Sequence, residues 1–195
     1  KTLSALRLAD GIARVSGPGT FVIDTEANRA LAYADSRTFR HVSFGAPFDP
    51  LSYLAAIEHC VKQGARTVVI DSMSHEHEGP GGVLEMHEAE VERMSRGDEA
   101  KAERVKIGAW QKPKSERRRL INTMLQLRCN VIMCFRAKEK IKVEKGKPPV
   151  PLGWQAIAGD EFIYECALSC LLLPGCDGRP TWAPNEPAER QMIKL

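Results

Sequence analysis

Short apolar runs alternate with longer stretches of helical periodicity along this chain of 195 residues. We expect strands at residues 19–24, 39–44, 66–71 and 129–135. We expect amphipathic helices, with apolar side chains at spacings of three and four, at residues 3–13, 49–64 and 115–127. The run at 66–71 is apolar at successive positions, which is typical of a strand buried on both faces of a parallel sheet. This alternation predicts an α/β fold, with a mainly parallel sheet flanked by helices.

The helix at 49–64 has well-marked ends. Asp49 is a good N-cap, Pro50 suits the first helical position, and Gly64 is a typical stop signal. Beyond residue 160 the pattern changes to short apolar runs around a Gly/Pro-rich turn, which predicts antiparallel strands added at the C-terminal edge of the sheet.

Two segments interrupt the alternation of strands and helices. Residues 73–114 are highly charged and open with a Gly/Pro cluster, and residues 137–159 are basic and rich in proline. We expect both to be long irregular insertions, functional or disordered, within a single domain that spans residues 1–195.

Composition narrows the class of protein only slightly. The formal net charge of +3 is too small to indicate a nucleic-acid-binding protein by itself. No apolar run approaches the roughly 18 residues of a membrane span, so we expect no membrane association. The six cysteines form no C-x-x-C pair, and several lie in apolar runs, which favours reduced, buried thiols in a cytoplasmic protein.

Acidic residues follow two of the predicted strands. Asp71 and Ser72 end the strand at 66–71, and Asp24 and Glu26 end the strand at 19–24. The carboxyl ends of parallel strands form the edge at which α/β proteins bind ligands. A carboxylate there can bind a metal or activate a water molecule. The alternatives are an Asp-Ser turn after the strand and a Glu26 that only caps the following helix.

The first two residues carry a further signal. Lys1 and Thr2 followed directly by an amphipathic helix are typical of the end of a phosphate-binding loop, G-x-x-x-x-G-K-[ST]. We therefore expect the strand and the glycines of such a loop to lie upstream of Lys1. Lys1 would then contact the β- and γ-phosphates, and the Thr2 hydroxyl would bind Mg²⁺.

Lys1-Thr2 with its helix, "FVIDTE", "TVVIDS" and "NVIMCFRAKEK" occur in the order found in RecA-like ATPases. The chain resembles the recombinase-related, AAA-family P-loop ATPases of bacteriophages. This resemblance implies that Glu26 is the catalytic base and that Asp71 and Ser72 bind Mg²⁺ or its waters. It also implies that Arg136 senses the γ-phosphate, although recombinases carry a glutamine where this chain offers Arg136 or Lys138.

The resemblance implies a function as well. We expect an enzyme that binds ATP and hydrolyses it with Mg²⁺, and that forms a ring or filament. It would act on single-stranded DNA in phage recombination or replication, in the cytoplasm of the bacterial host. Two other classes stay open: a P-loop kinase of a small molecule or nucleotide, and a non-hydrolysing scaffold that binds DNA or protein.

The basic segment is the candidate DNA contact. Its cations are Lys138, Lys140, Lys142, Lys145 and Lys147, and Trp154 follows them. Lysines can contact phosphates while an aromatic ring stacks on a base. The alternative is a solvated lysine-rich hairpin with a Trp that packs inward.

Two charged clusters have weaker functional interpretations. His75, Glu76, His77 and Glu78, with His87 nearby, could bind a metal, but no second ligand pair has fixed spacing. We therefore expect a solvated loop that leads into a charged helix around residues 85–92. Residues Arg117–Arg119 point in different directions around a helix. One of them could act as an arginine finger, but we expect a solvated face.

Overall fold

The computed structural model describes residues 1–143, 146, 148–181 and the backbone of 190–191. The chain divides into two compact parts, one formed by residues 2–134 and the other by residues 135–195 together with Lys1.

The first part contains a four-stranded parallel sheet in the order β2-β1-β3-β4. Its strands are β1 (Thr20–Asp24), β2 (Arg40–Ser43), β3 (Thr67–Asp71) and β4 (Asn130–Cys134). All four lie where the apolar runs predict strands. The central pair is aligned so that Asp24 lies opposite Asp71. The α/β class and the parallel sheet are therefore confirmed.

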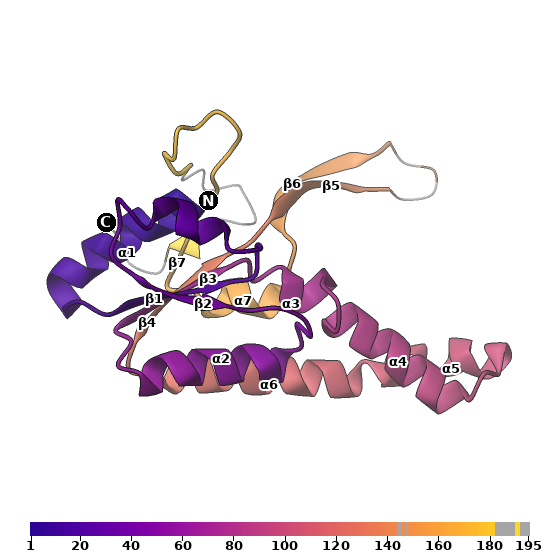
Figure 1. The fold of residues 1–195 in the computed structure, drawn as a ribbon. Helices are drawn as coiled ribbons and strands as arrows, with labels where there is room; N and C mark the ends of the chain where they lie inside the picture. The colour runs from indigo at the N-terminus through magenta and orange to yellow at the C-terminus, as the bar shows by residue number, and fades with distance from the viewer. Residues whose placement is uncertain (144–145, 147, 182–189, 192–195) are drawn as a thin grey trace. The chain divides into compact units, whose positions relative to one another are not determined.

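Helices cover both faces of this sheet (Figure 1). One face carries α1 (Thr2–Ser16), together with the short 3₁₀ helix η1 (Arg29–Tyr33). The opposite face carries α2 (Pro50–Lys62) and α6 (Gln111–Gln126), which pack side by side. The arrangement has three layers, with the sheet in the middle.

The two-residue period of a strand divides the apolar side chains of the sheet between these layers. Val22 and Val69 point toward α1 and form one core cluster with Leu6, Ala9, Ala30 and Cys134. By the same alternation Ile23 and Ile70 point toward α2 and α6, and both are fully buried. Asp24 and Asp71 lie two residues beyond Val22 and Val69, so both carboxylates belong to the α1 side of the sheet.

The predicted ends of α2 are confirmed. Asp49 accepts hydrogen bonds from the backbone N–H groups of Leu51 (3.0 Å) and Ser52 (2.9 Å), and Pro50 is the first helical residue. The helix ends at Lys62, Gln63 is its C-cap, and Gly64 follows with a positive φ of 88°.

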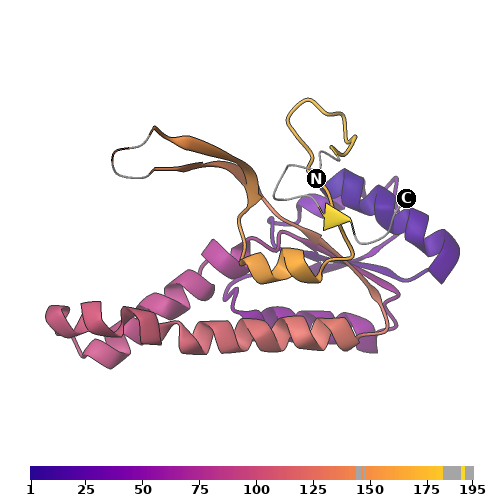
Figure 2. The same ribbon diagram turned by 180° about the vertical axis from the view of Figure 1, so that it is seen from behind.

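The segment at 73–114 is helical and not irregular, which corrects that expectation, whereas the charged helix predicted around residues 85–92 is confirmed. It forms α3 (His75–Glu78), α4 (Val83–Ser95), α5 (Glu99–Ala109) and the first turn of α6. Figures 1 and 2 both show α4 and α5 extending beyond the sheet as a helical hairpin. Many charges in this segment lie on exposed helix surfaces, where alternating Glu, Lys and Arg are compatible with helix.

The second part of the chain contains two small antiparallel sheets. Strands β5 (Ala137–Lys142) and β6 (Val150–Ala156) form a hairpin, and β7 (Leu168–Ser169) pairs with β8 (Arg190–Gln191). Antiparallel pairing is as predicted, but these strands form separate sheets and are not an edge of the parallel sheet. The apolar run that opens with Phe162 contains β7 but begins as a helix. Its first residues belong to α7 (Asp160–Glu165), in which Phe162 contacts Phe135 with ring centroids 5.7 Å apart.

None of the helices in the described ranges combines the length and the apolar character that a membrane span requires.

Candidate functional site at the carboxyl edge of the sheet

The chain leaves the carboxyl ends of β1 and β3 in opposite directions. After β1 it passes over the α1 face through η1 to β2 on one side, and after β3 it passes through α3, α4, α5 and α6 to β4 on the other side. The order of the strands therefore reverses between β1 and β3. In open α/β sheets ligands bind at such a point, the crevice of the carboxyl edge. The two loops at this point, named the loops of the crevice, are residues 25–28 after β1 and residues 72–74 after β3.

Thr2 and Asp71 meet at this edge. The Thr2 hydroxyl donates a hydrogen bond to Asp71 Oδ2 at 2.5 Å, and both residues are buried. Thr2 is also the first residue of α1, where helical N–H groups without helical partners favour an anion. A hydroxyl and a carboxylate oxygen in contact are ligands that Mg²⁺ prefers. The predicted roles of Thr2 and Asp71 toward Mg²⁺ stay predictions.

Asp24 holds the loop that carries Glu26. Its two carboxylate oxygens accept hydrogen bonds from the backbone N–H groups of Glu26 (2.8 Å) and Ala30 (2.8 Å), and His41 Nε2 lies 3.2 Å from Oδ2. Asp24 therefore supports the start of η1 through the N–H of Ala30. The Glu26 side chain is 8% exposed and lies 3.8 Å from Arg29 Nη1.

A polar cluster joins the two loops of the crevice. The backbone N–H of Thr25 donates to the carbonyl of Asp71 (2.8 Å), and the N–H of Ser72 donates to Thr25 Oγ1 (2.6 Å). His75 Nδ1 lies 2.7 Å from the same Thr25 oxygen, and the Tyr53 hydroxyl donates to the carbonyl of Ser72 at 2.9 Å. Burial, followed by the charge of Glu76, raises the pKa of Tyr53 far above its usual value, so Tyr53 remains a donor.

Ser72 is fully buried in this cluster. Its hydroxyl donates to the carbonyl of Cys134 at the end of β4 (3.3 Å), and the N–H of Ser74 donates to that hydroxyl (3.3 Å). The peptide bond between Asp71 and Ser72 is cis. The predicted role of Ser72 toward the waters of Mg²⁺ stays a prediction.

The segment around His75 is not a solvated loop, which corrects that expectation. Glu76 is completely buried and accepts two hydrogen bonds from Arg117, at 2.9 Å and 2.8 Å. Arg117 Nη2 also lies 3.1 Å from His77 Nδ1. Arg117 is therefore buried as well, whereas Arg118 and Arg119 are exposed as expected. A buried carboxylate needs a paired cation, which accounts for Arg117 turning inward.

Sequence reasoning missed the roles of Thr25, Tyr53 and Arg117. Thr25 lies between Asp24 and Glu26, and a hydroxyl directly after a strand could have indicated a loop contact. Tyr53 and Arg117 carry no comparable signal, because the segments they contact are distant in the sequence.

Lys1 and Arg136 belong to the second part of the chain. Arg136 is exposed, and its carbonyl accepts a hydrogen bond from the N–H of Ile157 at 2.8 Å. The phosphate-binding role of Lys1 and the sensor role of Arg136 stay predictions.

The β5–β6 hairpin separates the residues predicted to contact DNA. Glu139 pairs with Trp154 and Ile141 pairs with Pro151, so β6 carries one extra residue, next to Gly153 at φ 71°. With this register β5 alternates regularly, and its three lysines, Lys138, Lys140 and Lys142, share one face. Trp154 lies on the other face and is partly buried. Lys145 and Lys147 lie outside the described residues.

The histidines do not form a metal site with their neighbours. No group of three or more His, Cys, Asp or Glu side chains that could hold a metal ion occurs within the described ranges. His87 instead stacks on Trp110, with ring centroids 4.0 Å apart, and its Nε2 lies 2.9 Å from the Lys106 carbonyl.

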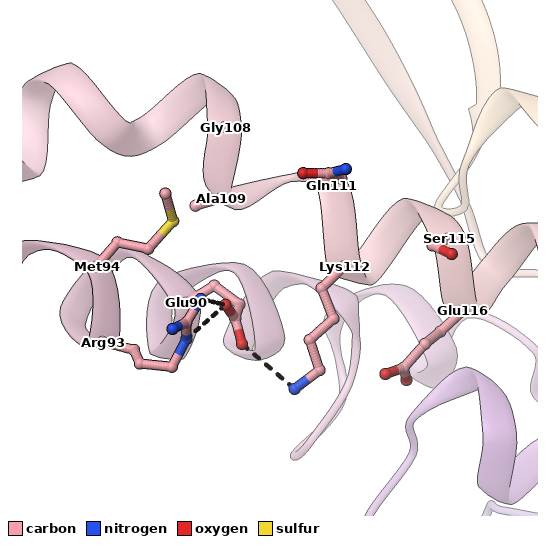
Figure 3. A pocket seen from close by; sticks show the side chains of 9 residues that line it. All are labelled: Glu90, Arg93, Met94, Gly108, Ala109, Gln111, Lys112, Ser115 and Glu116. Carbon is pink, nitrogen blue, oxygen red and sulfur yellow. Dashed lines mark hydrogen bonds and ion pairs between the residues drawn. The ribbon is translucent and has the colours of Figure 1, made fainter.

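A pocket of about 650 Å³ lies between α4, the end of α5 and α6, and no residue of the crevice lines it (Figure 3). Within it Glu90 accepts hydrogen bonds from Arg93 (2.9 Å) and Lys112 (3.3 Å), which lower the pKa of Glu90. Burial raises the pKa of Glu116 nearby. Its charged residues are largely paired with one another, so the crevice at the carboxyl edge is the better candidate site.

Comparisons of this chain with protein-family models, with curated proteins and with solved structures found no match.

Proposed function

We propose that this chain is the core of a P-loop ATPase of the RecA-like class, which binds Mg²⁺ and ATP at the carboxyl edge between β1 and β3. The contact between Thr2 and Asp71 carries this proposal. It joins a helix N-terminus, a hydroxyl and a buried carboxylate at the point where the strand order reverses. That combination suits a metal ion bridging two phosphates.

Each residue has a defined task in the proposed reaction. Thr2 and Asp71 hold Mg²⁺ and its waters, and Lys1 neutralises phosphate charge. Glu26, on the loop fixed by Asp24, accepts a proton from the attacking water, so that ATP and water give ADP and inorganic phosphate. Arg136 senses the γ-phosphate. The metal supplies electrostatic stabilisation of the phosphate oxygens when it is bound.

The test uses the full-length protein as its gene encodes it. Glu26→Gln should retain ATP binding while kcat falls by about 10²-fold to 10⁴-fold, because the water loses its proton acceptor. Asp71→Asn should weaken the dependence on Mg²⁺. Glu88→Gln, the same substitution on the exposed surface of α4, is the matched control and should leave turnover unchanged. Normal turnover in Glu26→Gln would remove Glu26 from this role, and phosphate transferred to an acceptor would indicate a kinase.

We further propose that the lysine face of the β5–β6 hairpin contacts single-stranded DNA in an assembly of several copies. Three cations on one face at alternate positions suit a row of phosphates. For single strands the slope of log K against log salt changes by about 0.7 per phosphate contact. Lys138→Ala with Lys140→Ala should therefore flatten the slope by about 1.4. Lys101→Ala with Lys106→Ala, on exposed positions of α5, should not change it.

Substitution of Trp154 tests where single-stranded DNA would lie on the hairpin. A base stacked on its ring would contribute about 1–3 kcal/mol, which Trp154→Ala would remove. Trp154 lies on the face of the hairpin opposite to the lysines. A loss of DNA affinity in Trp154→Ala would therefore require the DNA strand to pass over the edge of the hairpin and contact both faces. Failure of the wild-type protein to bind an oligonucleotide at low salt would end the DNA proposal and leave the ATPase proposal standing.

A further inference from the structure

Thr25 makes contacts that a residue of a simple surface loop does not need. It lies between Asp24 and Glu26, is buried, and forms hydrogen bonds with the residues on either side of the Asp71–Ser72 peptide. Its N–H binds the Asp71 carbonyl, and its Oγ1 accepts from the Ser72 N–H and lies 3.1 Å from the Ser72 carbonyl. The loop that carries Glu26 is thus tied directly to the loop that begins at Asp71.

The Thr25 hydroxyl has one proton and two neighbouring acceptors. The Ser72 carbonyl lies 3.1 Å away and already accepts from Tyr53, whereas His75 Nδ1 lies 2.7 Å away. The hydroxyl can donate to only one of them. If it donates to Ser72, His75 must donate through Nδ1. If it donates to His75, the ring carries its proton on Nε2. His75 therefore completes the hydrogen bonding of Thr25 in either arrangement.

The ring of His75 is itself held in place. It stacks on Phe48 with centroids 5.0 Å apart and planes inclined by 28°. The chain after α3 passes so close that a Cβ on Gly79 would lie 2.9 Å from the Cβ of His75 and 2.8 Å from the ring of Phe48. This packing leaves the imidazole little room to rotate away from Thr25.

We propose that Thr25 and His75 are positioning residues, whose contacts with Ser72 set the Glu26 loop against Asp71 at the separation that hydrolysis requires. This role rests on the proposed ATPase function. Glu26 is held from both sides, since its own N–H binds Asp24 and the preceding residue binds Ser72. A small displacement of a reacting group can cost about 10²-fold in rate, so a modest change in this cluster has a large kinetic effect.

The test separates positioning from simple stabilisation by comparing matched substitutions in the full-length protein. Thr25→Val removes the hydroxyl but keeps the shape, and Thr25→Ser keeps the hydroxyl. We expect kcat to fall by about 10²-fold in Thr25→Val with KM for ATP within about threefold, and to recover in Thr25→Ser. Asp98→Ala removes the N-cap of α5 and should lower the melting temperature without lowering kcat.

A second pair of variants covers the case in which Thr25→Val does not fold. His75→Phe keeps a ring to stack on Phe48 but loses Nδ1, whereas His75→Asn places an amide close to the Nδ1 position. We expect the first to lose kcat by about tenfold or more and the second to retain most of it.

A measurement independent of turnover is ¹⁵N NMR of the histidine rings. The Nδ1 resonance of His75 should shift in Thr25→Val and return in Thr25→Ser. An unchanged resonance would mean that the two side chains do not interact in solution, and would overturn the role. If the wild-type protein hydrolyses ATP and both Thr25→Val and His75→Phe have a normal kcat, the positioning role of Thr25 and His75 is overturned, whereas the proposed ATPase function stands. Absence of any wild-type hydrolysis would overturn both.

Discussion

The buried pair of Glu76 and Arg117 allows a quantitative prediction about stability. Glu76 is 0% exposed and Arg117 is 5% exposed, and two hydrogen bonds of 2.9 Å and 2.8 Å join them. Removing one partner leaves a buried charge without compensation, which typically costs about 3–5 kcal/mol. We therefore expect Arg117→Met to lower the free energy of unfolding by about this amount. For a chain of this size that corresponds to a fall in melting temperature of about 6–20 °C.

The neighbouring arginines of α6 provide a matched control. Arg118 follows Arg117 directly in the same helix and is exposed, so Arg118→Met should change stability by less than about 0.5 kcal/mol. The double variant Glu76→Met with Arg117→Met removes both charges, and should be more stable than Arg117→Met alone. Thermal and urea denaturation, followed by circular dichroism, measure all three variants.

The comparison can refute the reasoning directly. Equal stability of Arg117→Met and Arg118→Met would mean that Arg117 does not compensate a buried carboxylate. If the double variant were less stable than Arg117→Met, removing the charge of Glu76 would not relieve the cost of losing Arg117. The Glu76 side chain would then stabilise the packing of α3 on α6 in some way other than by pairing with Arg117.

Three further predictions concern the same fold. Gly82→Ala should destabilise the protein by about 1–3 kcal/mol in urea denaturation, because the new Cβ would lie 2.8 Å from three backbone carbonyl oxygens. Gly45→Ala is the control: a Cβ at Gly45 meets no atom within 4 Å, so this substitution should cost less. Cys60 should react with iodoacetamide at pH 8.5 far more slowly than the exposed Cys170, because burial raises the pKa of the Cys60 thiol to about 11. Equal reaction rates of the two thiols would contradict the burial of Cys60. The thiol of Cys60 loses its proton near its ordinary pKa in the unfolded chain but keeps it to about pH 11 in the folded protein. The free energy of unfolding should therefore fall as the pH rises from about 9 to about 11, and should fall less in Cys60→Ala.

The sequence determined the parallel sheet and the helices next to it. These elements are specified by local chemistry: apolar runs of strand length, the cap at Asp49 and the stop at Gly64. It also indicated that Asp24 and Asp71 end two of the strands, whereas the pairing of these strands in the structure places the two residues opposite each other. Period-two alternation then puts both carboxylates on the face that carries α1.

Local sequence patterns mispredicted secondary structure in two segments, one of which is highly charged and the other a short apolar run. In the segment at 73–114 the sequence predicted only the charged helix around residues 85–92, because the charge of the segment and its Gly/Pro cluster hid the helical character of α3 and α5. The run at Phe162 is apolar enough for a strand, yet it begins as the helix α7, because short apolar runs do not distinguish the two.

Only the tertiary structure decided which polar residues of the crevice act together. Thr25 meets Ser72 and His75 across separations of 47 and 50 residues, and Glu76 meets Arg117 across 41. No periodicity spans such distances, because each contact depends on how the sheet and helices bring distant loops to one edge. Among three consecutive arginines, the choice of Arg117 for burial follows from the side of α6 that faces Glu76, and that side is fixed only when the helix packs.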